Sequence, residues 1–199
     1  MEKICCVFAA GEYKEKPIIP EGAFIIAADG GEKILLSMGI KSDLTLGDFD
    51  SLKTNPQGKE IIRYPVKKDD TDTHLAIKEG LLRGYKIFYI FGACGGRLDH
   101  TIANMQSLSY LAENGARGFL INGNEMITAI KNSSFKIEKE CDFSVFALSG
   151  IAEGVSIKGA LYEAENITLT PSIPLGVSNS TSSGAEISVK NGTLHILLR

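Results

Sequence analysis

The stretch Leu44-Thr45-Leu46-Gly47-Asp48-Phe49-Asp50-Ser51 decides how the rest of the chain is interpreted. Leu44 and Leu46 alternate with a polar residue, which is typical of a strand, and Gly47 then ends the run. If the backbone stays extended, Asp48 and Asp50 leave the same side, with their Cα atoms about 6.6 Å apart. Two carboxylates so placed repel each other, and a divalent cation bound through oxygen ligands would offset that repulsion. The alternative is a solvated turn, because Gly-Asp and Asp-Ser are common loop dipeptides.

Short apolar runs alternate with helical patterns on both sides of this stretch. Strands are expected at residues 3–9, 23–28, 44–46, 61–64 and 86–91, and helices at residues 30–38, 70–82 and from Leu98 onward. Strands that alternate with helices indicate βαβ units. The first part of the chain is therefore predicted to be an α/β domain with a mainly parallel sheet.

The pattern changes at the turn Asn122-Gly123-Asn124. Short strands are expected afterwards, at residues 126–131, 135–138, 143–147, 155–158, 167–169, 185–189 and 193–198, and no amphipathic helix is visible among them. The segment Val189-Lys190-Asn191-Gly192-Thr193-Leu194 fits a hairpin with a two-residue type I′ turn. The sequence thus predicts two domains, an α/β domain over residues 1–124 and an all-β sandwich over residues 125–199.

Composition narrows the class of protein. The 199 residues carry a net charge of −3 and no long basic run, which argues against a broad nucleic-acid or membrane surface. The four cysteines show neither CxxC pairs nor zinc spacing, and the neighbours Cys5 and Cys6 suit a reducing compartment. The apolar run Ile4–Ala10 is too short to span a membrane and lacks signal-peptide features. A cytoplasmic protein without nucleic-acid or membrane partners is expected.

Polar motifs follow the expected strands of the α/β part, where ligands of an open α/β sheet bind. They are Ala28-Asp29-Gly30-Gly31, Gly47–Ser51, Lys67–Asp72 and Gly92–His100. Each has a simpler explanation: Asp29 or Asp70 could cap a helix, the glycines could make tight turns, and Lys67 and Lys68 could be solvated. Five or six carboxylates on one rim, taken together, favour bound cations over these separate explanations.

The Gly92–Gly96 segment adds a phosphate-binding feature. Its backbone N–H groups would be exposed at the start of the helix near Leu98, and Arg97 offers a planar fork for phosphate oxygens. With carboxylates for Mg²⁺, this set predicts phosphoryl-type transfer from a nucleotide. Neither a Walker A motif nor GxGxxG is present. His100 and Asn104 share a helix face, which suits either a general base or a hydrogen-bonding helix residue.

Four motifs in this order resemble the signature of the thiamine pyrophosphokinases: Asp29-Gly30-Gly31, Gly47-Asp48-Phe49-Asp50-Ser51, Asp69-x-Thr71-Asp72 and Gly95-Gly96-Arg97-x-Asp99-His100. Gly176-Val177-Ser178-Asn179 resembles the family as well, so the match spans nearly the whole chain. The resemblance implies a three-layer α/β/α catalytic domain, a C-terminal β-sandwich and a homodimer that binds thiamine at the subunit interface. It also implies transfer of the diphosphoryl group of ATP to the hydroxyethyl oxygen of thiamine, giving thiamine diphosphate and AMP.

The resemblance assigns roles to single residues. Mg²⁺ would be held by Asp48, Asp50 and Asp72, and Arg97 completes the expected catalytic set. Contacts with ATP would come from Asp29, Gly30, Gly95, Gly96, Arg97, Asp99, His100 and Asn104, and contacts with thiamine from Asp69, Ser178 and Asn179. Either Asp72 or Asp69 would accept the alcohol proton. Ser180 and Thr181 depart from the Glu and aromatic residue that commonly follow Ser-Asn, and the chain has no tryptophan for ring stacking.

Other functions fit parts of the pattern. A related diphosphokinase could act on another small alcohol, such as a hydroxymethylpterin. A non-catalytic nucleotide- or vitamin-binding sensor would need no carboxylate cluster prepared for a metal. A structural β-module joined to an inert α/β domain is disfavoured, because it leaves the polar motifs at the strand ends without a role.

Overall fold

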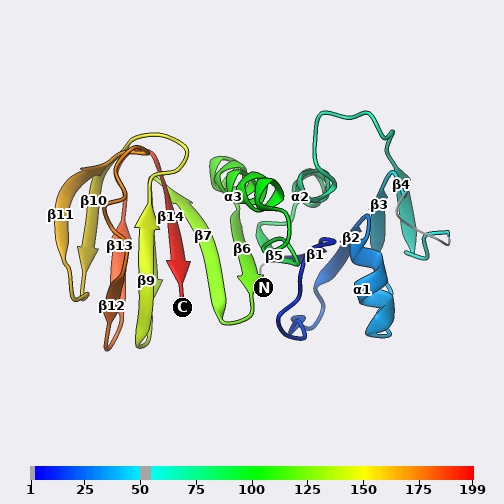
Figure 1. Ribbon diagram of the computed structural model, residues 1–199, viewed down its shortest axis with the longest axis horizontal. Helices are drawn as coiled ribbons and strands as arrows, with labels where there is room; N and C mark the ends of the chain where they lie inside the picture. The colour runs from blue at the N-terminus through cyan, green and yellow to red at the C-terminus, as the bar shows by residue number, and fades with distance from the viewer. Residues whose placement is uncertain (1–2, 50–54) are drawn as a thin grey trace. The chain divides into compact units, whose positions relative to one another are not determined.

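The computed structural model describes residues 3–49 and 55–199 and divides the chain into two compact units (Figure 1). The first unit comprises the residues up to Ser107 together with Gly118–Gly123. The second comprises Leu108–Arg117 and Asn124–Arg199. The chain is therefore of mixed α/β class, as predicted. No helix in the described ranges is long and apolar enough to cross a lipid bilayer.

The first unit is built on a sheet with strand order β6-β5-β1-β2-β3-β4. β1 pairs in parallel with β2 and β5, β2 with β3, and β3 with β4, as the alternation of strands and helices predicts. The strands are β1 (Ile4–Phe8), β2 (Phe24–Ala28), β3 (Leu44–Gly47), β4 (Glu60–Arg63), β5 (Ile87–Phe91) and β6 (Arg117–Asn122). Sequence analysis missed β6, because this strand adjoins a turn signal and shows no long alternation.

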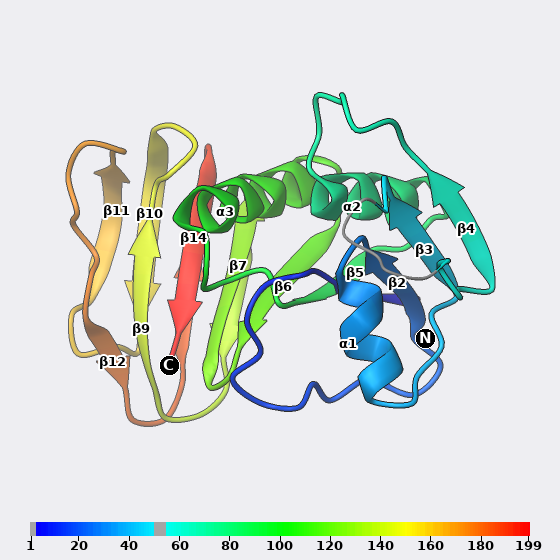
Figure 2. The same cartoon turned by 45° about the vertical axis from the view of Figure 1, so that its right-hand side comes forward.

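The helices of the first unit are α1 (Gly31–Ser37), α2 (Asp72–Leu82) and the beginning of α3 (Leu98–Glu113). Cys6 and Leu35 share a buried cluster, whereas a Cβ placed on Gly80 of α2 would lie 3.3 Å from Cys5 Sγ. Because successive strand residues point to opposite faces, α1 and α2 contact opposite faces of β1 (Figure 2). The Thr71 hydroxyl caps α2 by accepting a hydrogen bond from the His74 N–H at 3.1 Å.

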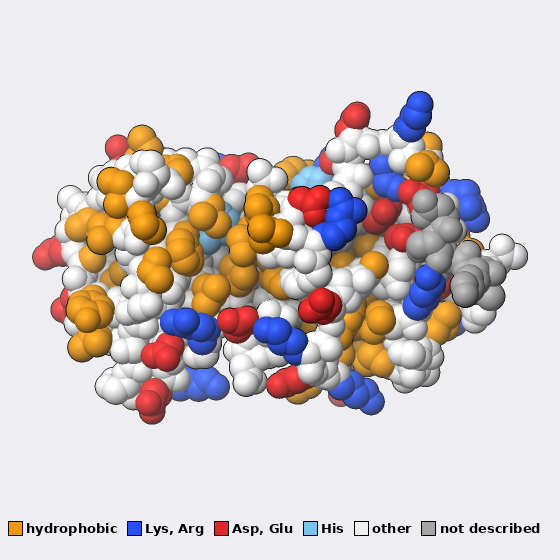
Figure 3. Space-filling view, in the orientation of Figure 1, with side chains coloured by type: hydrophobic (Ala, Val, Ile, Leu, Met, Phe, Trp, Pro, Cys, Tyr) orange, Lys and Arg blue, Asp and Glu red, His pale blue; other side chains and the backbone are white. Residues whose placement is uncertain are grey.

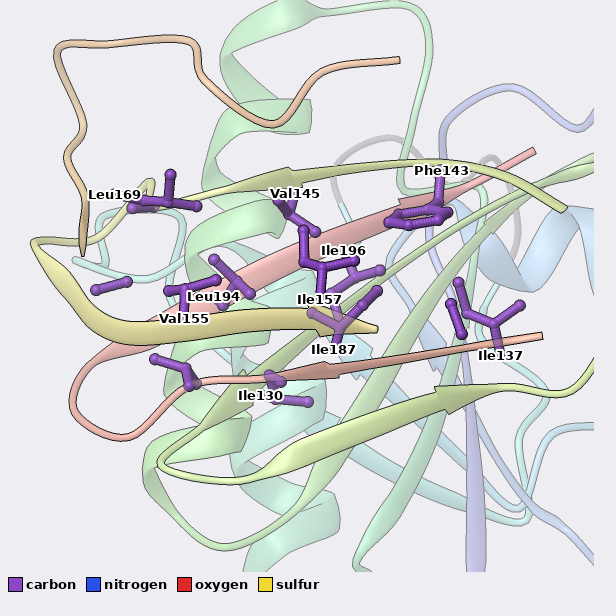
Figure 4. Close-up of a cluster of buried hydrophobic side chains, with 14 of the residues drawn as sticks. Ile130, Ile137, Phe143, Val145, Val155, Ile157, Leu169, Ile187, Leu194 and Ile196 are labelled. Atoms are coloured by element: carbon purple, nitrogen blue, oxygen red, sulfur yellow. The ribbon is translucent and has the colours of Figure 1, made fainter. Parts of the chain in front are cut away.

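The second unit contains two sets of antiparallel strands. One has the order β12-β9-β14-β7 and the other the order β11-β10-β13-β8. The strands are β7 (Glu125–Lys131), β8 (Ser134–Ile137), β9 (Cys141–Phe146), β10 (Ala152–Lys158), β11 (Ala164–Leu169), β12 (Asn179–Thr181), β13 (Ala185–Ser188) and β14 (Thr193–Leu198). Figure 4 shows their common core, in which Phe143 and Ile196 of one sheet lie with Val155 and Ile187 of the other. The short polar strand β12 was not predicted.

The predicted hairpin at Asn191-Gly192 is wrong. β13 pairs with β10 and β8, whereas β14 pairs with β7 and β9, so the turn carries the chain from one sheet to the other. Asn191 forms an isolated bridge with Glu153 instead. The local sequence fits a tight turn, but burial of Ile187 and Ile196 in one core decides which strands pair.

Candidate active site

The ends of β2 and β3 bring the first two acidic motifs together. The Asp29 N–H donates a hydrogen bond to the Leu46 carbonyl at 2.7 Å. Gly47 has φ +151°, and a Cβ placed there would lie 3.0 Å from Asp29 Cβ. A side chain at position 47 would therefore push the two strand ends apart. The glycine of this motif allows Asp29 and Asp48 to lie next to each other.

Contacts around Phe49 fix the backbone that carries Asp48. Phe49 has φ +63° and only 6% of its surface is exposed, so its ring points into the unit. The Arg63 guanidinium lies 4.9 Å from the centre of that ring, and Arg63 Nη1 donates to the Asp48 carbonyl at 3.3 Å. The neighbouring residues Asp50 and Ser51 lie outside the described residues.

A lysine joins the second and third acidic motifs. Lys68 Nζ lies 3.0 Å from Asp48 Oδ2 and 2.9 Å from Asp72 Oδ1. The three side chains are mostly buried, with exposed fractions of 13% for Lys68, 14% for Asp48 and 24% for Asp72. Asp48 comes from the end of β3 and Asp72 from the first turn of α2. The fold thus directs two carboxylates from separate elements at one cationic nitrogen.

Electrostatics at this cluster follow from its partial burial. Burial raises the pKa of Asp72, and the nearby charges of Asp29 and Asp48 raise it further, while the Lys68 ammonium lowers it. For Lys68, burial lowers the pKa, but the hydrogen bonds and charges of Asp72 and Asp48 outweigh this effect and the net shift is upward. The charges of Asp29 and Asp48 therefore both act on Asp72, and Lys68 lies between Asp48 and Asp72.

The donor set suits a hard divalent cation. Asp48 Oδ2 and Asp72 Oδ1 already converge on one positive charge, and Mg²⁺ is commonly bound by one or two carboxylates plus water and substrate phosphates. No group of three or more His, Cys, Asp or Glu side chains within residues 3–49 and 55–199 is arranged to hold a metal ion. The third expected ligand, Asp50, is not among those residues. The residues present fit a cation held by two carboxylates.

The glycine turn after β5 has the expected backbone form. Gly92, Gly95 and Gly96 have φ of +64°, +81° and +64°, values that side chains other than glycine rarely adopt. The turn leads directly into α3, and Gly95 and Gly96 are exposed. Asn104 is 4% exposed, and its Nδ2 donates to the Ala93 carbonyl at 2.7 Å. Asn104 thus supports the turn from inside.

Arg97 and Asp99 pair at the tip of this turn. Arg97 Nη2 donates to Asp99 Oδ2 at 2.6 Å, and both side chains are well exposed. The hydrogen bond with Arg97 lowers the pKa of Asp99. Asp99 Oδ1 also accepts from the His100 N–H at 3.0 Å. Because solvent screens the attraction between exposed charges, this pair is weak, and a phosphate can replace Asp99 as the partner of Arg97. His100 is exposed, and Gly30 immediately precedes α1.

Asp69 borders a hollow beside the start of α2. The cavity has a volume of about 240 Å³ and is lined by Asp69, Asp70, Thr71, His74, Ala103, Gln106 and Ser107. Asp70 does not cap the helix, because its carboxylate pairs with Lys78 at 2.7 Å. His74 Nδ1 lies 2.9 Å from the Ser107 hydroxyl. Asp69 is exposed at the mouth of this space, where it can meet a ligand.

The remaining predicted residues lie in the second unit. Ser178 has φ +60°, and its N–H donates to the Ser144 hydroxyl at 3.1 Å. Asn179 is 5% exposed and binds both backbone groups of Tyr162: its Oδ1 accepts from the N–H at 3.0 Å, and its Nδ2 donates to the carbonyl at 2.8 Å. Tyr162 itself is 65% exposed. Asn179 therefore holds the exposed Tyr162 segment in place.

Two residues of the site were not singled out from the sequence. Lys68 was treated only as a candidate surface charge, although its position four residues before Asp72 allows the observed contact. Glu32 gave no sequence signal. It is 3% exposed, and its Oε1 accepts hydrogen bonds from Thr45 Oγ1 and from the N–H groups of Gln57 and Gly58. Glu32 thereby anchors the chain that returns from the acidic motif to β4.

His195 serves the core of the second unit. It is 1% exposed, and its Nε2 lies 3.0 Å from the Ser109 hydroxyl on α3. This buried contact gives His195 a structural role.

Comparison with known proteins gives a consistent picture. A family model described as the catalytic domain of thiamin pyrophosphokinase matches residues 16–120, which is slightly more than half of the chain. The thiamine pyrophosphokinase of Bacillus subtilis (strain 168) is 29% identical over 164 residues, covering 77% of this chain and 76% of that protein.

Solved structures agree over almost the full length. The crystal structure of thiamine pyrophosphokinase from Bacillus subtilis has a TM-score of 0.87 and 26% identity, covering 98% of both chains. That from Geobacillus thermodenitrificans has a TM-score of 0.83 and 23% identity, covering 98% of this chain and 96% of the other, and supports the fold. The family match, the curated relative and the fold confirm the resemblance seen in the motifs: this chain belongs to the thiamin pyrophosphokinase family.

Proposed function

We propose that the Asp48–Lys68–Asp72 cluster is the catalytic centre at which this enzyme transfers the diphosphoryl group of ATP to thiamine. Its family activity is the formation of thiamine diphosphate with ATP as co-substrate. The observation that carries the assignment is the convergence of two carboxylates on one cationic nitrogen at 3.0 and 2.9 Å. Such a cluster at the end of β3 is where an open α/β sheet binds its ligands.

Asp48 and Asp72 are the proposed Mg²⁺ ligands, with Asp50 as the third. Bound there, Mg²⁺ supplies the positive charge that neutralises phosphate oxygens during transfer. The exposed backbone at Gly95 and Gly96 and the Arg97 guanidinium bind the phosphates. Further ATP contacts are assigned to Asp29, Gly30, Asp99 and His100, with Asn104 holding the glycine turn.

The acceptor alcohol attacks the β-phosphorus in line, and AMP leaves. Asp69 and Asp72 are the two candidates for accepting the alcohol proton, since Asp69 lies at the mouth of the adjoining cavity and Asp72 in the carboxylate cluster. The acidic cluster also attracts the cationic thiazolium ring of thiamine. The carboxylates thus serve both substrates: they hold the metal that binds ATP, and they attract thiamine.

The domain arrangement is part of the proposal. Residues 1–124 form a three-layer α/β/α catalytic domain, and residues 125–199 form a thiamine-binding β-sandwich of a cytoplasmic homodimer. Support comes from α1 and α2 on opposite faces of β1 and from the core shared by two antiparallel sheets. In the sandwich, Ser178 and Asn179 lie beside the exposed Tyr162 that Asn179 holds. Thiamine would bind where this segment meets the partner's catalytic domain.

Turnover with defined acceptors tests the proposed chemistry. The chain is incubated with ATP, Mg²⁺ and either thiamine or a hydroxymethylpterin, and AMP and the diphosphorylated product are separated chromatographically. AMP and thiamine diphosphate in equal amounts are expected. A diphosphorylated pterin in the absence of thiamine diphosphate would assign a different acceptor, and binding of both ligands without AMP release would indicate a sensor.

Mixing two variants, each altered in a different half of the proposed site, tests whether the site is shared. Asp48→Asn impairs the catalytic domain and Asn179→Ala the sandwich, so a mixed dimer with a site between subunits regains one intact site. Activity should then recover after the two proteins are unfolded and refolded together, compared with each variant refolded alone. Failure to recover, with a dimer present by light scattering, would place the complete site within one chain.

A further inference from the structure

Lys68 occupies the space between the two proposed metal ligands. Its Nζ lies at nearly equal distances from Asp48 Oδ2 and Asp72 Oδ1, 3.0 and 2.9 Å, and the side chain is only 13% exposed. Lys67, one residue earlier, is exposed. The buried lysine therefore has a placement that its neighbour does not share, and the metal and nucleotide assignments above give it no role.

A positive charge is needed at this point before any metal arrives. Asp48 and Asp72 are mostly buried, and unlike charges nearby are what keep such carboxylates ionised and close. The ammonium provides that charge and donates a hydrogen bond to Asp48. Lys68 thus holds the two carboxylates in a converging arrangement, at the cost of filling the space between them.

The same space is the natural position for a divalent cation. Mg²⁺ binds oxygen ligands at about 2.0–2.1 Å, well inside the 2.9–3.0 Å at which the ammonium lies. Two cations this close would repel each other strongly in a partly buried site. Simultaneous occupation by Lys68 and a metal is therefore strongly disfavoured.

We propose that the Lys68 ammonium is an internal cation that holds Asp48 and Asp72 in the metal-free protein and is displaced when a divalent cation binds to them. This inference rests on the proposed metal site. Its consequence is selectivity: free metal must compete with Lys68, whereas metal that arrives with a polyphosphate brings anionic oxygens that can receive the displaced ammonium. Lys68 is in this view a positioning residue that favours the metal–nucleotide complex over the bare ion.

A competing arrangement makes the opposite prediction. Lys68 could keep its contacts and orient one oxygen of each carboxylate while a metal binds the other oxygens. Removing the lysine would then disorganise the ligands and weaken metal binding. Displacement predicts tighter binding after removal, so the sign of the change separates the two arrangements.

The test is a titration of the full chain with Mn²⁺ alone, without nucleotide, in which free Mn²⁺ is measured by electron paramagnetic resonance. Lys68→Met should bind Mn²⁺ about tenfold more tightly than the unaltered chain, a change of about 1.4 kcal/mol. Lys67→Met is the matched control, because it removes the same charge from an exposed neighbour, and it should change affinity less than about twofold, as expected for a screened surface charge. Lys68→Arg keeps a cation and should remain as weak as the unaltered chain.

Each outcome decides the inference. Unchanged, weaker or undetectable Mn²⁺ binding in Lys68→Met overturns it, and Lys68→Gln provides the same comparison if the Met variant does not fold. The double variant Asp48→Asn/Lys68→Met should lose the gain, and retention of the gain would place the ion elsewhere and overturn the inference. Turnover of the unaltered chain with ATP and thiamine tests the proposed function separately, so an active enzyme without the Mn²⁺ effect loses only the role of Lys68.

Discussion

The two units of this protein use polar residues in opposite ways. In the first unit, Asp48 at the end of β3 and Asp72 at the start of α2 converge on Lys68. In the second, the polar Asn179 is buried and satisfies backbone groups of Tyr162. Figure 3 shows neighbouring acidic and basic side chains on the first unit and patches of hydrophobic side chains on the second. Mostly buried charged groups of the first unit thus meet where chemistry is proposed, whereas the buried amide of Asn179 in the second unit supports the backbone.

A core substitution in the second unit should have the largest effect on stability. Phe143 is fully buried among Ile196, Val155 and Ile187. Phe143→Ala leaves a cavity and is expected to lower the free energy of unfolding by roughly 3–5 kcal/mol. Urea unfolding measures this loss, and Phe143→Leu, which keeps most of the volume, should lose clearly less. A cost below about 1 kcal/mol for Phe143→Ala would show that this core does not hold the unit together.

A substitution in the carboxylate cluster should have the reverse pattern: a large effect on turnover and a small effect on stability. Asp48→Asn keeps the size of the side chain but removes the charge that is proposed to bind metal. Turnover is expected to fall by about 10²–10³-fold, the size seen when one preorganised electrostatic contributor is removed. Steady-state AMP release measures it, and the melting temperature checks the fold.

The exposed Glu186 on β13 provides the matched control, since Glu186→Gln removes the same charge from the other unit. Its turnover should equal that of the unaltered chain. Near-normal turnover of Asp48→Asn would remove Asp48 from the catalytic centre and erase the contrast between the two units.

Loss of the hydrogen bonds between Asn179 and Tyr162 should have an intermediate effect on stability. Asn179→Ala leaves the Tyr162 N–H and carbonyl without their side-chain partners, which is expected to cost about 1–3 kcal/mol of stability. The exposed segment around Tyr162 should also be cut faster by chymotrypsin. Asn179→Asp retains the acceptor but sets a buried carboxylate oxygen against the Tyr162 carbonyl, so it should destabilise the protein at least as much as Asn179→Ala. Unchanged cleavage would mean that other contacts hold Tyr162.

Thiol labelling compares the two units at single cysteines, and this is the smallest of the expected effects. Burial raises the pKa of Cys6 to about 12, and it also raises the pKa of Cys5, whereas Cys141 of the second unit is partly exposed. At pH 8 an alkylating reagent should modify Cys141 first, and Cys141→Ser should abolish the fast phase. At pH 10 the buried Cys6 should still be largely a protonated thiol, so its labelling should stay slow. Rapid labelling of Cys6 would instead reveal local opening of the first unit.

The acidic motifs could be assigned from sequence because their signals are local. Gly47 before Asp48 and the segment from Asp69 to Asp72 each sit at a predicted element boundary, and the structure has strands and helices close to those boundaries. The roles in catalysis and ligand binding that were given to the site residues, Asp50 and Ser178 included, stay predictions, because no contact with a ligand tests them.

Other features depended on distant partners and could not be predicted. The prediction of a hairpin at Asn191-Gly192 was wrong, because a turn sequence specifies a local bend but does not specify the sheet that its strands join. Strands β6 and β12 have little periodicity of their own. Glu32 has no sequence signal at all, since its three hydrogen bonds come from residues that are 13 to 26 positions away.

The sequence by itself determined the α/β class, the order of most of the elements and the residue types of the candidate catalytic motifs, because hydrophobic periodicity and turn chemistry act over short distances. Only the tertiary structure decided that Asp48, Lys68 and Asp72 meet at one point. The end of β3 and the beginning of α2 are separated along the chain, and they are brought together by packing on a common sheet. Lys68, which the sequence suggested to be a surface charge, is thereby placed between two carboxylates as the internal cation of the site.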